Sequence, residues 1–65
     1  MPEPKEIGER LRRLRGEIDR STVAQGCGIS VSAVSMYENG IRVPRDEIKV
    51  RLAKFYGKTV ESIFY

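Results

Sequence analysis

The chain has 65 residues, of which 40% are hydrophobic and 32% are charged, and its formal net charge is +3. This length allows one domain, residues 1–65, with a core but without an enzyme-sized cleft, and the composition argues against disorder. A single cysteine and no histidine exclude an internal disulfide, the usual zinc ligand sets, and Cys–His or Ser–His nucleophiles.

We therefore expect no enzymatic activity, no metal and no cofactor, and nothing in the sequence indicates a small-molecule ligand. No apolar run approaches the ~20 residues of a membrane span, and the charged start MPEPKEIGERLRRLR does not look like a signal peptide. This predicts a cytoplasmic protein without a membrane partner. Eight of the 12 basic residues are arginine, the residue type that binds phosphate and guanine in bidentate fashion.

The first predicted helix runs from about Pro4 to residue 15 or 16. Proline suits a first helical turn, and Ile7, Leu11 and Leu14 mark one apolar face at i, i+4 and i+7. The rest of its surface carries four arginines: Arg10, Arg12, Arg13 and Arg15.

Residues 20–39, RSTVAQGCGISVSAVSMYEN, space small and apolar residues as a helix-turn-helix does. The second helix is expected from an N-cap at Asp19 to about Gly26, followed by a turn in which Gly28 can adopt positive φ. Cys27 lies at an apolar position of the motif, so we interpret its thiol as a core group rather than a redox sensor.

Ser30 is the expected N-cap of the third helix, 31–38, which stops at Asn39-Gly40. A fourth helix is expected over about 46–56. A short fifth helix follows Thr59 and carries three apolar residues: Val60, Ile63 and Phe64. Strand signals are missing, so the predicted fold is all-α, a compact bundle of five short helices.

On a helical wheel, Val34 and Tyr37 face inward, and the opposite arc of the third helix faces outward. The major groove of B-DNA accommodates one helix, so this arc is the candidate base-reading surface. It consists of Val31 at the tip, then Ser32, Ser35 and Met36. Serine alone discriminates poorly among bases, and the alternative is a mixed surface without a function.

Glu38 lies on the inner side of the same helix, so its carboxylate needs a cationic partner. Arg15 is our first choice and Arg13 the second, and we interpret the pair as structural. Contacts to the DNA backbone are assigned to residues at the helix ends and in the following loop: Arg20, Ser30, Asn39, Arg42 and Arg45. The alternative for each cation is ordinary surface charge.

From Ile7 to Phe64 the sequence resembles the Cro/phage-repressor type (XRE family) of helix-turn-helix DNA-binding domains. The motifs that carry the resemblance are Val23-Ala24, Gly28-Ile29-Ser30, Tyr37-Glu38-Asn39-Gly40, Pro44, and Ala53…Gly57…Phe64. The resemblance implies a lambda-repressor-like fold and sequence-specific binding of double-stranded DNA. It also implies a homodimer on a palindromic operator, a role in transcription, most often as a repressor, and a bacterial or phage origin.

Carried over by position, the resemblance supports the same base-reading, backbone-contacting and ion-pair residues. The sequence departs from the family pattern in two places. The connection from Arg15 to Asp19 is about two residues shorter than usual, and Arg45 stands where the fourth helix usually has a hydroxyl cap, so that helix start is expected to fray.

Two questions stay open at the level of sequence. The apolar end Ile63-Phe64-Tyr65 is a candidate dimer contact, while Phe64 could equally pack on the core of its own chain. The weak base-reading chemistry of Ser32 and Ser35 also keeps a second function in view. In that reading the helix-turn-helix is a protein-interaction module, antitoxin-like or polymerase-contacting, with weak DNA binding.

Overall fold

Five helices make up the fold in the computed structural model, which describes residues 2–65. They are α1 (Pro4–Arg15), α2 (Arg20–Cys27), α3 (Val31–Glu38), α4 (Asp46–Tyr56) and α5 (Val60–Phe64), with no strand in the described part of the chain. The all-α prediction is therefore confirmed. None of the helices in this range is both long and apolar enough to cross a bilayer.

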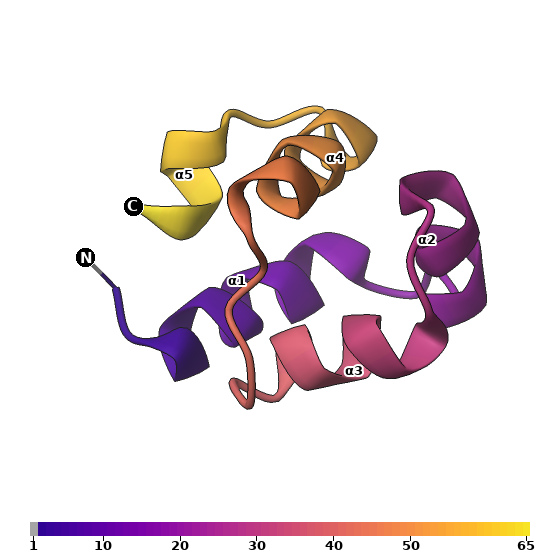
Figure 1. Cartoon of the computed structure of the whole chain (residues 1–65), viewed down its shortest axis with the longest axis horizontal. Coiled ribbons are helices and arrows are strands. Elements are labelled where there is room, and N and C mark those ends of the chain that lie inside the picture. The colour runs from indigo at the N-terminus through magenta and orange to yellow at the C-terminus, as the bar shows by residue number, and fades with distance from the viewer. Residues whose placement is uncertain (1) are drawn as a thin grey trace.

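Helix α1 crosses the middle of the molecule (Figure 1). Helix α3 lies along one side of α1, and α4 and α5 lie along the other. Helix α2 packs against α3 and α4 at the end away from both termini. The predicted helix-turn-helix, α2 and α3, is thus supported by α1 and α4.

Local capping explains most of the helix boundaries. The hydroxyls of Ser30 and Thr59 accept hydrogen bonds from backbone N–H groups three residues later, at 3.0 and 3.1 Å. Gly28 ends α2 with φ of 68°, so α2 includes Cys27 and runs one residue further than predicted. Asp19 and Arg45 occupy N-cap positions, but neither side chain makes a capping hydrogen bond.

The core combines apolar residues from all five helices: Ile7, Leu11, Val23, Ala24, Cys27, Val34, Tyr37, Leu52, Ala53, Ile63 and Phe64. Cys27 is a buried free thiol, as predicted for a core residue, and this desolvation raises its pKa. Burial of these side chains from helices far apart in sequence holds α3 in place.

The apolar patch considered for the C-terminus does not exist, because Ile63 and Phe64 are only 1% and 0% exposed. Helix α5 turns both side chains onto the core, and only Tyr65 stays half exposed. The ammonium group of Lys49 covers this end, 4.8 Å from the Tyr65 ring centre, and donates to the Tyr65 hydroxyl at 3.1 Å. Of the two alternatives left open, packing on the chain's own core is correct.

Candidate nucleic-acid interface

Helix α3 turns one face to the core and leaves the other open. Val34, Tyr37 and Glu38 are buried. On the outer face Val31 is 47% exposed and Ser32 is exposed, while Ser35 and Met36 are partly exposed. The four candidate base-reading residues are therefore accessible in the described structure: Val31, Ser32, Ser35 and Met36.

A close approach between α1 and α3 sets the position of this helix. Residue 8 is a glycine, and a Cβ atom built there would lie 2.8 Å from the carbonyl oxygen of Tyr37. Gly40, which follows α3, has φ of 71° and faces the backbone of Lys5 in the same way, with 2.8 Å between a built Cβ and the Lys5 Cα. Backbone therefore meets backbone where α3 ends.

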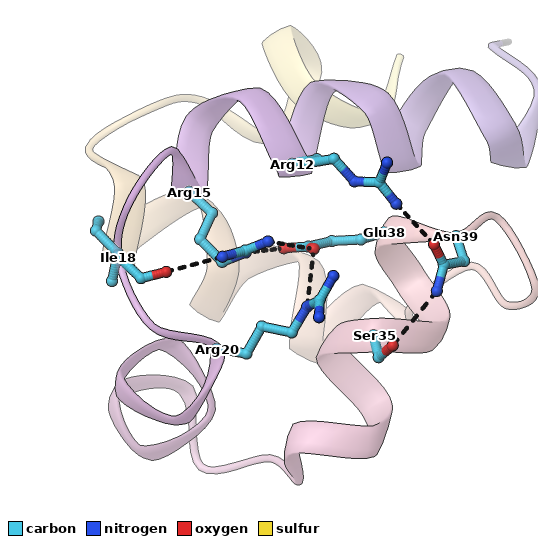
Figure 2. A network of polar contacts seen from close by, with 7 residues as sticks. All are labelled: Arg12, Arg15, Ile18, Arg20, Ser35, Glu38 and Asn39. Atoms are coloured by element: carbon cyan, nitrogen blue, oxygen red, sulfur yellow. Dashed lines mark hydrogen bonds and ion pairs between the residues drawn. The ribbon is translucent and has the colours of Figure 1, made fainter.

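The carboxylate of Glu38 lies in the space between α1, α2 and α3, with 1% of the side chain exposed. Arg15 binds both of its oxygens: Nε donates to Oε2 at 2.6 Å and Nη2 donates to Oε1 at 3.1 Å (Figure 2). The hydrogen bond to Glu38 raises the pKa of Arg15. Arg13, the second choice for this pairing, is exposed and makes no ion pair within residues 2–65.

Arg20 is the second cation on the same carboxylate. It is the first residue of α2, and its Nε donates to Oε1 of Glu38 at 3.2 Å while 39% of its side chain stays exposed. Arg20 was predicted only as a contact to the DNA backbone, and its ion pair with Glu38 was not predicted. Figure 2 shows Glu38 between the two arginines, Arg15 from α1 and Arg20 from α2.

A second polar chain links α1 to the end of α3. Nη2 of Arg12 donates to Oδ1 of Asn39 at 2.7 Å, and Nδ2 of Asn39 donates to Oγ of Ser35 at 3.3 Å (Figure 2). Asn39 is thus held in one orientation at the surface. Arg12, an exposed cation that sequence reasoning did not single out, lies beside it.

The remaining candidate backbone contacts gather on the other flank of α3. An open hollow of about 460 Å³ is lined by Ser30, Arg42 and Arg45, together with residues of α3 and α4. Glu47 also lines this hollow but is paired with Arg51 at 2.9 Å. In the described chain, Arg42 and Arg45 make no ion pair, so their charge is not offset by a protein carboxylate.

A family model described as helix-turn-helix matches residues 10–63, which is most of the chain. No curated protein was found to match this chain. The chain belongs to the Cro/phage-repressor type (XRE) family of helix-turn-helix domains.

Membership in the XRE family makes this chain a DNA-binding helix-turn-helix regulator, with α2 and α3 as its helix-turn-helix. The matched range includes every residue assigned to the candidate interface, and it also includes Arg12. A signal for Arg12 was present in the sequence. Gly8, Arg12 and Arg15 recur at i, i+4 and i+7, so one stripe of α1 carries the close approach and both arginines that contact the end of α3.

Proposed function

We propose that this XRE-family regulator reads duplex DNA by placing α3 in the major groove, with Val31, Ser32, Ser35 and Met36 facing the base edges. We propose further that it represses transcription as a homodimer on a palindromic operator. Occupancy of a promoter by a small domain is sufficient to repress, so no catalytic group is required. The cytoplasm of a bacterium, where chromosomal and phage DNA are transcribed, is the compartment in which it would act.

The observation that carries this proposal is the position of positive charge around α3. At about 100° per residue, Ser32, Ser35 and Met36 occupy one arc, with Glu38 beyond one edge of it and Ala33 beyond the other. The flank of Glu38 carries Arg20, and that of Ala33 carries Arg42 and Arg45 in the hollow. A helix in a groove about 12 Å wide has a phosphate backbone on each side, and this charge distribution matches both.

The test is in-vitro selection from random duplex DNA, followed by affinity measurements on the selected sequence and on altered ones. Met36→Ala and Ser32→Ala are expected to change which sequences bind, because these side chains would contact bases. Arg20→Ala is expected to weaken all sequences alike and to lower the slope of log K against log salt by about 0.9.

Arg13→Ala is the matched control, since it removes the same charge from the far face of α1, in a hollow shared with Lys58 and Ser62. It is expected to leave the sequence preference unchanged. Equal losses on every sequence for Met36→Ala would remove the base-reading assignment.

A second candidate function is a protein-interaction module, and exposed apolar side chains favour it. Ile41 is 69% exposed, Val50 48% and Val43 41%, so the α3–α4 loop and α4 present apolar surface. Failure of the selection to enrich any duplex would favour this function over the first. A steep loss of DNA affinity with rising salt would favour the first.

A further inference from the structure

We propose that Glu38 is a positioning residue for DNA binding. It holds the guanidinium of Arg20 in the orientation in which that group binds a DNA phosphate. This inference rests on the proposed function and assigns a second task to a carboxylate that otherwise only joins α1 to α3. Its basis is the hydrogen bond from Nε of Arg20 to Oε1 of Glu38, at 3.2 Å.

The atoms that remain free on Arg20 are those a phosphate needs. Only Nε is used by Glu38, and within residues 2–65 no group accepts a hydrogen bond from either Nη nitrogen of Arg20. These two nitrogens form a planar fork that matches two phosphate oxygens. Because 39% of the side chain is exposed, the fork can be reached from solvent.

The carboxylate of Glu38 is fixed in the interior of the fold. It is 1% exposed and is held on both oxygens by Arg15. Glu38 is therefore a buried anchor, and Arg20 is the more exposed partner that it restrains. Two guanidinium groups share one carboxylate, so the cluster keeps a net positive charge toward DNA.

Restraint before binding has a measurable consequence. Immobilising a free arginine on a phosphate loses rotamer entropy, and an arginine already restrained by Glu38 loses less. From the usual cost of ordering one long side chain at an interface, the expected gain in DNA affinity is about fivefold.

The test is a double-mutant cycle on the selected DNA, at a temperature where circular dichroism shows every variant to be folded. We expect Arg20→Ala to weaken wild-type binding about tenfold but to weaken Glu38→Gln binding only about twofold. Arg15→Gln is the matched control, since it also breaks the core ion pair but leaves Glu38 to hold Arg20. In that background Arg20→Ala keeps its full effect of about tenfold.

Arg20→Lys tests the same idea without touching the buried carboxylate. Lysine keeps the charge, but its single nitrogen cannot hold Glu38 and also offer a fork, so we expect it to lose the gain from restraint and to bind about fivefold more weakly than wild type. Retention of wild-type affinity by Arg20→Lys would overturn the inference. An equal effect of Arg20→Ala in the wild-type and Glu38→Gln backgrounds would overturn it as well, as would tighter binding by Glu38→Gln alone.

The two levels of proposal fail differently. Wild-type protein that binds no duplex removes the proposed function and this inference together. Wild-type protein that binds a selected duplex, with no coupling between positions 20 and 38, removes this inference and leaves the proposed function in place.

Discussion

A carboxylate that is almost fully buried depends on its cations, and Glu38 has two. Arg15 supplies two hydrogen bonds, and its own side chain is 16% exposed. Arg20 supplies one bond, from a more exposed position. The cost of desolvating the charge is offset mainly by Arg15, because its geometry is bidentate and its pKa is raised by the same contact.

The Arg15→Ala variant is expected to lower the free energy of unfolding by about 3 kcal/mol, because it leaves a buried carboxylate with Arg20 alone. Arg13→Ala, which removes an exposed cation from the same helix, is expected to stay within about 0.5 kcal/mol of wild type. Urea unfolding followed by circular dichroism at neutral pH measures both. Equal losses in the two variants would show that the ion pair adds nothing specific to stability.

Tyr56 makes stability depend on alkaline pH. Burial, followed by the nearby charge of Glu38, raises the pKa of Tyr56 from its usual 10.0 to about 12. The unfolded chain therefore loses this proton first as pH rises, and the free energy of unfolding falls between pH 10.0 and about 12. Below that range Tyr56 is protonated in both states and adds no pH dependence.

Tyr56→Phe removes this group, so its stability is expected to fall less steeply than that of wild type over the same range. Urea unfolding of both proteins at a series of pH values provides the measurement. A decline in Tyr56→Phe as steep as in wild type would assign the pH dependence to other groups.

Helix positions could be predicted from the sequence because their signals are local. The Ser30 and Thr59 caps and the left-handed Gly28 act within three or four residues of their own position. The packing of one helix on another depends instead on residues that are far apart in the sequence. The close approach at Gly8 depends on the crossing of α1 and α3, which no single helix pattern specifies.

Gly8→Ala tests that crossing. Alanine favours a helix interior over glycine by about 1 kcal/mol, so helix propensity alone predicts stabilisation. The Cβ atom would lie 2.8 Å from the Tyr37 carbonyl oxygen, however, and backbone cannot move aside as a flexible side chain can. We expect a net loss of about 2 kcal/mol in urea unfolding. Glu9→Ala at the exposed neighbouring position is the control, and a stabilised Gly8→Ala would refute the tight crossing.

The candidate interface, which draws on several helices, combines parts that could be predicted from sequence with parts that could not. The exposure of Ser32, Ser35 and Met36 follows from helix period alone. The ion pair between Arg20 and Glu38 could not be predicted, because it depends on how α2 packs against α3. The neighbours of Phe64 could not be predicted for a similar reason, since sequence shows that Phe64 is apolar but not which part of the molecule covers it.

The size of the described chain bears on the proposed dimer. Its longest dimension is 28 Å, and half-sites one helical turn apart place two recognition helices about 34 Å apart on one side of the duplex. Two copies with their 28 Å axes along the duplex would fit side by side at this spacing. We therefore expect the selected DNA to contain two inverted half-sites about one turn apart, and to bind two copies cooperatively.

Inserting about five base pairs between the half-sites rotates one of them to the opposite side of the duplex. Contact between the copies is then lost, so cooperativity is expected to disappear while each half-site still binds one copy. Sedimentation and titration of fluorescent duplexes give the stoichiometry and the two binding steps. The same duplex without the inserted base pairs is the control. Selected DNA with a single half-site that saturates at one copy per duplex would contradict the dimer and leave base reading by α3 untouched.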